Sequence, residues 1–237
     1  MHVSQRNPDG LIELGVMAKF WNAGLVKTRL GASIGMQQAA MVHQIFCRYL
    51  SQQLRLAAGR REFVVSPVET VDGFRQTLPD DWQVRPQSSG DLGQRMKHWF
   101  GRALAPGTSA SRILIGADCP LVDQALIDEA SRGLLHHDVV LGPALDGGYY
   151  LIGIAGAWTA KHDALMNNMP WSSNRVFDLT CQRAEQAGLT LQVLRPMEDI
   201  DTTSELDRLR QQLRSAEPGS PQARLGMDLD RVLVTPG

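Results

Sequence analysis

Short apolar runs alternate along the chain with segments in which apolar residues recur every three or four positions. Strands that are buried on both faces of a sheet form continuous apolar runs, whereas a helix with one buried face repeats about every 3.6 residues. The apolar runs therefore predict strands over residues 11–18, 62–66, 82–85, 113–116, 138–141, 149–154 and 189–194, with the weakest pattern over 82–85.

The longest helical pattern spans residues 36–58, where Ala39, His43, Phe46 and Leu50 recur at steps of three and four. Further helices are predicted from the residues at their ends. They are residues 91–105, before Pro106-Gly107; 123–135, capped by Asp123; a helix capped by Ser172 or Ser173 that ends near Gly188; and a helix opened by the capping box Thr202-x-x-Glu205.

Strands that alternate with helices predict an α/β fold, with a mostly parallel central sheet covered on both faces. We expect one domain over residues 11–215, followed by a loose C-terminal tail over residues 216–237, where Pro, Gly and Ser are frequent. Ligands of such sheets bind outside the carboxyl ends of the strands. The residues that directly follow each strand are therefore the candidates for function.

The composition excludes several classes of protein. The 237 residues are 43% hydrophobic and 21% charged, close to globular averages, which argues against wholesale disorder. A formal net charge of −1 argues against nucleic acid as a partner. Three cysteines without short spacing do not indicate a disulfide framework or a CxxC metal site. We expect no membrane segment and a cytoplasmic location, because no long apolar stretch or signal region is apparent.

The loop after the first predicted strand contains three cations and a glycine: Lys19, Gly24, Lys27 and Arg29. Backbone N–H groups and cationic side chains of such a loop can bind phosphate groups. The spacing matches neither a P-loop nor a GxGxxG motif. A solvated basic loop without a ligand is the alternative interpretation.

Two acidic segments follow predicted strands. Asp118 comes directly after the strand over 113–116, and Asp199 and Asp201 precede the helix with the capping box. Carboxylates at a cleft are natural ligands for a hard divalent cation. The alternatives are that Asp118 caps the next helix, and that Asp199 and Asp201 favour a helix dipole.

Three further segments are candidates for binding. The glycines of Asp146-Gly147-Gly148 allow close approach of a ligand, although a tight turn needs them equally. The segment 89–96 precedes and opens a helix, so its free backbone donors can bind a base or a phosphate, although it also suits an ordinary helix start. Its candidate residues are Gly90, Asp91, Gly93 and Arg95. Trp171 either covers a pocket or fills the core.

Taken in order, six segments resemble the bacterial DUF2064 family, also called the selenodomain-associated or arsenosugar-biosynthesis type glycosyltransferases. The resemblance covers about residues 11–210. The segments are MAK…GLVKTRLG, GDLGQRM, ILIGADCP, DVVLGPALDGGYYLIGI, PWSS and DIDTTSEL. The family usually has a stretch such as APVPG before KTRL, whereas this chain has FWNAG, without the prolines.

The family is similar to nucleotide-diphospho-sugar transferases of the glycosyltransferase A fold, which also serves guanylyltransferases of the molybdenum cofactor and of phospholactate. The resemblance implies a single Rossmann-like domain of this fold. It implies that Asp118 is the metal-binding Asp, that Asp201 or Asp199 supplies a second carboxylate, and that Lys27 and Arg29 bind the nucleotide. Pro120 stands where a DxD motif would have its second acid.

The resemblance thus implies a glycosyltransferase that uses Mg²⁺ or Mn²⁺ to move a sugar from a nucleotide-diphospho-sugar to a small acceptor. Its expected catalytic residues are Asp118, Lys27, Arg29 and Asp146, and its acceptor or sugar site contains Asp146, Gly147, Gly148 and Trp171. A nucleotidyltransferase that uses an NTP, transfers a guanylyl or cytidylyl group and releases pyrophosphate is the first alternative. A catalytically degenerate nucleotide-binding protein is the second. The oligomeric state, including a homodimer, is left open.

Overall fold

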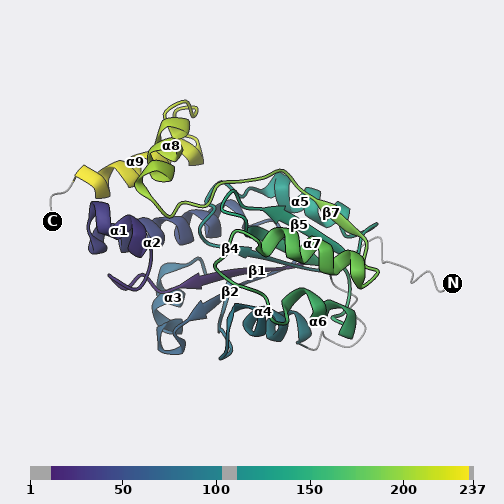
Figure 1. Ribbon diagram of the computed structural model, residues 1–237. Coiled ribbons are helices and arrows are strands. Elements are labelled where there is room, and N and C mark those ends of the chain that lie inside the picture. The colour runs from purple at the N-terminus through teal and green to yellow at the C-terminus, as the bar shows by residue number, and fades with distance from the viewer. Residues whose placement is uncertain (1–11, 103–110, 235–237) are drawn as a thin grey trace.

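The centre of the computed structural model, which describes residues 12–102 and 111–234, is a seven-stranded sheet (Figure 1). Its strands are β1 (Ile12–Lys19), β2 (Arg60–Ser66), β3 (Gln83–Pro86), β4 (Ser111–Gly116), β5 (Val139–Pro143), β6 (Tyr149–Ile154) and β7 (Leu191–Val193). The strand order is β3-β2-β1-β4-β6-β5-β7. Strand β6 runs antiparallel to both neighbours, and the other described pairs are parallel. The predicted α/β fold with a mostly parallel sheet is therefore confirmed.

Helices cover both faces of the sheet. They are α1 (Thr28–Ile34), α2 (Met36–Gln53), α3 (Val71–Thr77) after the short 3₁₀ helix η1 (Val68–Thr70), α4 (Leu92–Gly101), α5 (Gln124–Gly133), α6 (Ala160–Met166), α7 (Val176–Gln186), α8 (Thr203–Leu213) and α9 (Pro221–Val234). The packing places α2, α3 and α5 on one face and α4, α6 and α7 on the other. No helix within the described ranges is long and apolar enough to cross a membrane.

The alternation of side chains along the strands explains the apolar runs within the central strands β1 and β4. In β4, Ile113 and Ile115 pack on the α2–α3–α5 side, and Leu114 packs on the opposite side. Strand β1 places Leu14 and Val16 in the same way as Ile113 and Ile115. Because both faces of these central strands are buried, a polar residue has no solvent-facing position until the strand ends.

Some predicted element ends differ from the structure. Helix α2 ends at Gln53 rather than at residue 58, and the Trp82 indole N–H donates to the carbonyl oxygen of Ser51 in its last turn, at 2.9 Å. Arg175, rather than Ser172 or Ser173, precedes helix α7 as its N-cap residue. The predicted strand position 11 and helix positions 103–105 lie outside the described residues.

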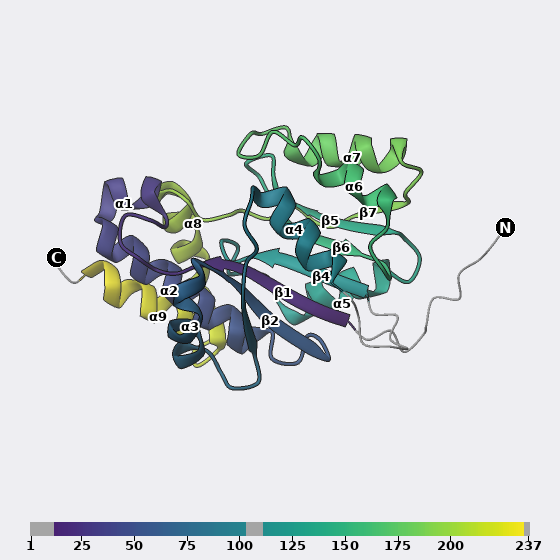
Figure 2. The ribbon, with the colours of Figure 1, turned by 90° about the horizontal axis from the view of Figure 1, so that it is seen from below.

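The expectation of a loose tail after residue 215 is wrong for residues 221–234, which form α9. Leu225, Leu229 and Val232 of this helix are buried against apolar residues of α2 and α8. Figures 1 and 2 both show α8 and α9 beside α1 and α2 at one end of the molecule. The frequent Pro, Gly and Ser residues suggested an irregular tail, but the apolar residues of α9 lie on one face and stabilise the helix by packing.

A buried ionic cluster fastens the end of α4 to the starts of the central strands. Arg112 donates to Glu13 at 2.7 Å, and Arg102 forms ion pairs with Glu13 at 3.1 Å and with Glu62. The Trp99 indole N–H also donates to Glu62. Since buried charges must be paired to be tolerated, this cluster fixes the position of α4, which contributes to the cleft described next.

Candidate functional site

A cleft of about 560 Å³ lies at the carboxyl end of the sheet. Figure 2 shows the arrow of β1 pointing toward the end of the molecule where α1 and α8 lie. Ten of the residues predicted from the sequence line this cleft, and they come from six separate segments. They are Lys19, Lys27, Arg29, Arg95, Asp118, Asp146, Gly148, Trp171, Asp199 and Asp201.

Asp118 and Asp201 lie together although they are far apart in sequence. The Ile200 N–H donates to the carbonyl oxygen of Asp118 at 3.0 Å, which joins the segment before α8 to the turn after β4. The Lys27 ammonium group then contacts both carboxylates, Asp201 at 3.0 Å and Asp118 more closely. The predicted convergence of the two carboxylates is thus present, with a cation of the protein itself between them.

The backbone directs Lys27 into the cleft. Lys27 precedes α1 in the left-handed conformation, with φ 47° and ψ 40°, which is uncommon for residues other than glycine. Its side chain is 2% exposed and its ammonium lies 5.7 Å from the centre of the Phe46 ring. Burial alone lowers the pKa of a lysine, but the charges of Asp118 and Asp201 outweigh burial and raise the pKa of Lys27. Lys27 is therefore a permanent cation here.

His43 is the second cation beside Asp118, and sequence reasoning placed it only on the buried face of a helix. Its Nε2 lies 3.0 Å from the carbonyl oxygen of Lys19, and its Nδ1 lies 3.6 Å from Asp118 Oδ1. Burial opposes protonation, but Cys47 and Asp118 favour the charged ring and raise the pKa of His43 to about 10. Nδ1 has no hydrogen-bond partner among the described residues, so its contact with Asp118 is electrostatic.

The two cations determine the charge state of Asp118. Burial raises the pKa of this carboxyl, but the charge of Lys27 and the interaction with His43 prevail and hold it well below its usual range. The side chain of Asp118 is nevertheless 48% exposed, so one side of the carboxylate faces the cleft. Asp118 is thus an ionised group that a ligand can reach.

Asp201 and Asp199 differ in their surroundings. Only Asp201 shares the Lys27 ammonium with Asp118, and its backbone N–H donates to Glu205, as does that of Thr202, each at 2.6 Å. The bond from Thr202 belongs to the predicted capping box, and the two bonds together fix the start of α8. Burial and the nearby charge of Asp146 raise the pKa of Asp199 to about 6. Of the two alternatives, Asp201 is better placed to act together with Asp118.

The two carboxylates fit a divalent cation whose remaining ligands come from the substrate and from water. In the part of the chain that the structure describes, no three His, Cys, Asp or Glu side chains are grouped as a metal site. Mg²⁺ is, however, commonly held by one or two carboxylates together with substrate phosphates and water. Asp118 and Asp201 already surround one cationic group and supply these two carboxylates.

Arg95 projects into the cleft from α4 and is held in place by two bonds. Its guanidinium donates to the carbonyl oxygen of Gly90 at 2.9 Å and to Gln87 Oε1 at 3.1 Å. Gln87 in turn donates to the carbonyl oxygens of Ala18 and Val64 at the ends of β1 and β2. Arg95 is thus oriented by the sheet itself, and Gln87 is a cleft residue that sequence reasoning missed.

Several predicted ligand residues have structural roles and are not among the residues that line the cleft: Gly24, Gly90, Asp91, Gly93 and Gly147. Asp91 caps α4 and forms a capping box with Gln94. Gly93 leaves room for Trp171: a Cβ atom at this position would lie only 2.8 Å from the indole ring. Gly147, with φ 91°, packs against the backbone of Asn174.

Asp146 lies in the turn between β5 and β6 and lines the cleft. Its Oδ1 accepts the Gly148 N–H at 2.8 Å, so this carboxylate shapes its own turn. The side chain is exposed, and its other oxygen is open to a ligand. Trp171, half-buried, also lines the cleft.

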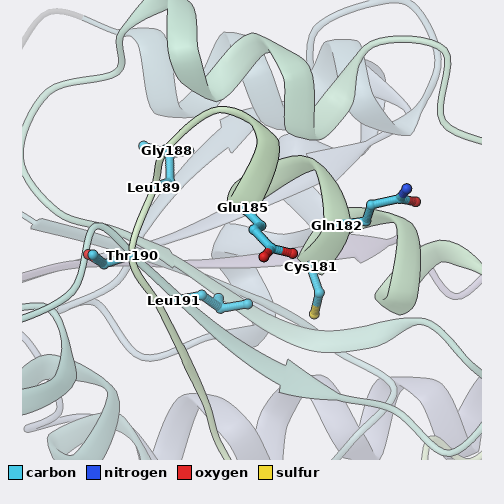
Figure 3. Close-up of a pocket in the computed structure, with 7 residues that line it drawn as sticks. All are labelled: Cys181, Gln182, Glu185, Gly188, Leu189, Thr190 and Leu191. Atoms are coloured by element: carbon cyan, nitrogen blue, oxygen red, sulfur yellow. The ribbon is translucent and has the colours of Figure 1, made fainter.

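A second hollow, of about 740 Å³, lies between α7 and β7 (Figure 3). Figure 3 shows Cys181 and Glu185 extending from α7 toward Leu191 of β7. Its remaining lining residues are Gln182, Gly188, Leu189 and Thr190. Because these residues include no cation and one carboxylate, this hollow lacks the groups that phosphate chemistry needs.

Comparisons with known proteins agree with the fold. A family model described as an uncharacterized protein conserved in bacteria (DUF2064) matches residues 49–173. A structure from Desulfovibrio desulfuricans G20, provisionally assigned as a nucleotide-diphospho-sugar transferase, is 27% identical with a TM-score of 0.84, covering 94% of this chain and 97% of that one. A comparison with curated proteins found no match.

Two more distant structures share the fold alone. The 4-diphosphocytidyl-2C-methyl-D-erythritol synthase from Anaerococcus prevotii DSM 20548 is 11% identical with a TM-score of 0.56, over 86% of this chain and 96% of that one. The manganese complex of Rv0371c from Mycobacterium tuberculosis H37Rv is 12% identical with a TM-score of 0.50, over 87% and 100%. The structural neighbours thus include a protein provisionally assigned as a nucleotide-diphospho-sugar transferase and, with the fold alone in common, a protein described as a nucleotidyl transferase.

Proposed function

The chain belongs to the bacterial DUF2064 family, and we propose that it is a metal-dependent glycosyltransferase that moves a sugar from a nucleotide-diphospho-sugar to a small acceptor. The observation that carries the proposal is that the carboxylates of Asp118 and Asp201 lie together at the carboxyl end of the sheet, where both contact the Lys27 ammonium. The similarity over nearly the whole chain to a protein assigned as a nucleotide-diphospho-sugar transferase supports it.

The cations of the cleft bind the diphosphate in this proposal. Lys19 and Arg29 are exposed at the ends of the β1–α1 loop, and Arg95 reaches the cleft from α4. Their fixed positive charges stabilise the negative charge that develops on the nucleoside diphosphate as it leaves the sugar. Because Gln87 and Gly90 hold the guanidinium of Arg95, little reorganisation is needed when the charge develops.

Asp118 and Asp201 hold Mg²⁺ or Mn²⁺ in this proposal. Such a cation neutralises phosphate oxygens and so makes the nucleoside diphosphate a better leaving group. His43 keeps Asp118 ionised, and the capping box keeps Asp201 in place. The manganese complex of Rv0371c supports the choice of a divalent cation.

The acceptor binds on the side of Asp146 and Trp171. One oxygen of Asp146 is engaged by the Gly148 N–H, and the other can take a proton from the attacking group of the acceptor. Trp171 offers an apolar surface to the sugar or to the acceptor. Both proposed roles are supported by the presence of these residues in the lining of the cleft.

Nucleotidyl transfer is the second candidate, and the fold shared with a 4-diphosphocytidyl-2C-methyl-D-erythritol synthase favours it. The same carboxylates and cations would serve attack on the α-phosphate of an NTP, with pyrophosphate as the leaving group. The two reactions therefore differ in product rather than in the charged part of the site.

Product analysis separates the candidates. The protein is incubated with Mn²⁺ and single nucleotide-diphospho-sugars, or with single NTPs, together with a panel of small hydroxyl and phosphorylated acceptors. Release of a nucleoside diphosphate that EDTA and Asp118→Asn abolish supports glycosyl transfer. Release of pyrophosphate supports nucleotidyl transfer instead. Binding of nucleotide without either product would indicate a degenerate binding protein and overturn both.

A further inference from the structure

Lys27 lies where the proposed divalent cation would have to bind. Its ammonium is in contact with both Asp118 and Asp201, and its side chain is almost fully buried. We propose that Lys27 holds the place of the divalent cation in the nucleotide-free protein, so that the cation and the nucleotide each strengthen the binding of the other. This inference rests on the proposed function, because it deepens the account of the same site.

The charges explain why a divalent cation alone binds weakly. The carboxylates of Asp118 and Asp201 carry −2. The Lys27 ammonium and the charged His43 ring beside Asp118 together carry +2, so little net negative charge remains to attract a metal ion. A divalent cation between the carboxylates would also lie close to the ammonium and repel it. Nucleotide phosphates add several negative charges to the site. Their oxygen atoms can bind the ammonium and the metal ion at the same time, so the metal ion is then attracted rather than repelled.

The local structure allows the ammonium to move. Lys27 follows an exposed loop, in which Asn22, Ala23, Gly24 and Leu25 face solvent. The left-handed backbone of Lys27 is a sparsely populated conformation that the surrounding contacts must maintain. Lysine has a flexible side chain with three donors, so its ammonium can turn from the carboxylates to phosphate oxygens in the same cleft.

The experiment measures Mn²⁺ affinity by calorimetry for the full chain, first without nucleotide and then with single nucleoside diphosphates. Wild type should bind Mn²⁺ weakly alone and at least tenfold more tightly with its preferred nucleotide. Lys27→Met keeps an apolar contact with Phe46 and should bind Mn²⁺ alone at least tenfold more tightly than wild type. Arg48→Met removes an exposed cation of α2 that does not line the cleft, and it should leave the affinity for Mn²⁺ alone unchanged.

A double variant assigns the gain to the carboxylates. Lys27→Met combined with Asp118→Asn should lose the tighter Mn²⁺ binding, because one of the two ligands is gone. Circular dichroism checks that each variant is folded, and Lys27→Gln provides a second uncharged replacement if the methionine variant does not fold.

Failure of this inference is distinguishable from failure of the proposed function. If Lys27→Met and Lys27→Gln bind Mn²⁺ no better than wild type, while nucleotide still strengthens Mn²⁺ binding, the place-holding role is wrong and the metal-dependent function stands. If the uncharged variants bind Mn²⁺ but wild type does not even with nucleotide, Lys27 replaces the metal permanently, and the exchange is wrong. If no protein binds Mn²⁺ under any condition, the proposed metal dependence itself fails.

Discussion

The backbone N–H of Ile200 donates a hydrogen bond to the carbonyl oxygen of Asp118, with a distance of 3.0 Å between nitrogen and oxygen. This bond joins the turn after β4 to the segment that enters α8. It places the Asp201 carboxylate beside that of Asp118, where Lys27 contacts both. The candidate site is therefore assembled by the tertiary fold from segments that are far apart in sequence.

Asp118→Asn should make stability less dependent on pH in the acid range. The pKa of Asp118 is lowered in the folded protein, so its stabilising contribution is present above the ordinary Asp pKa of about 4 and is lost as pH falls toward its folded value. At pH 6 the free energy of unfolding of wild type should exceed that of the variant by about 1 kcal/mol, as expected for a partly exposed ion pair. Urea unfolding at about pH 6, 5, 4 and 3, which brackets the ordinary Asp pKa of about 4, measures this dependence. A gap that stays constant down to the lowest pH would contradict it.

Gly93→Ala should destabilise the contact between α4 and Trp171. The added Cβ would lie 2.7 Å from the carbonyl oxygen of Met166 and 2.8 Å from the indole ring, so the free energy of unfolding should fall by about 1–3 kcal/mol. Gly101→Ala is the matched control on the same helix, because its Cβ would meet nothing within 4 Å. Equal stability of the two variants in urea unfolding would show that the contact is looser than described.

Arg29→Ala should weaken nucleotide binding without affecting the fold. Arg29 is exposed and lines the cleft at the start of α1, so its loss removes a charge-assisted bond to phosphate of about 1–3 kcal/mol. Calorimetric titration with nucleoside diphosphates measures the loss, and Arg48→Ala, an exposed arginine of α2 that does not line the cleft, is the control. Unchanged affinity in Arg29→Ala would favour the solvated-loop interpretation of this segment.

The sequence predicted the buried strands and the positions of the acidic residues well, for a physical reason. Strands such as β4 are apolar on both faces, so their ends are marked by the first polar residue, here Asp118 just beyond Gly116. In a sheet of mostly parallel strands such ends meet at one edge, which is why Asp118 and Asp201 could be expected together.

Other features depend on contacts that no local pattern encodes. His43 has the spacing of a core residue on α2, and only the packing of α2 against β1 and β4 turns it toward Asp118. The left-handed backbone that directs Lys27 inward is likewise a tertiary effect. The short helices α1, α3 and α6, seven residues each, offer too few turns for a helical period to be recognised.

Nucleoside diphosphate titration with Mn²⁺ and with EDTA tests the central claim most directly, which is that Asp118 and Asp201 together hold a divalent cation for the nucleotide. In wild type, Mn²⁺ should strengthen binding at least tenfold, which corresponds to about 1.4 kcal/mol. Asp118→Asn and Asp201→Asn should each abolish the gain, whereas Asp199→Asn should retain it. Equal affinity of wild type with Mn²⁺ and with EDTA, or a full gain in Asp118→Asn, would contradict the account.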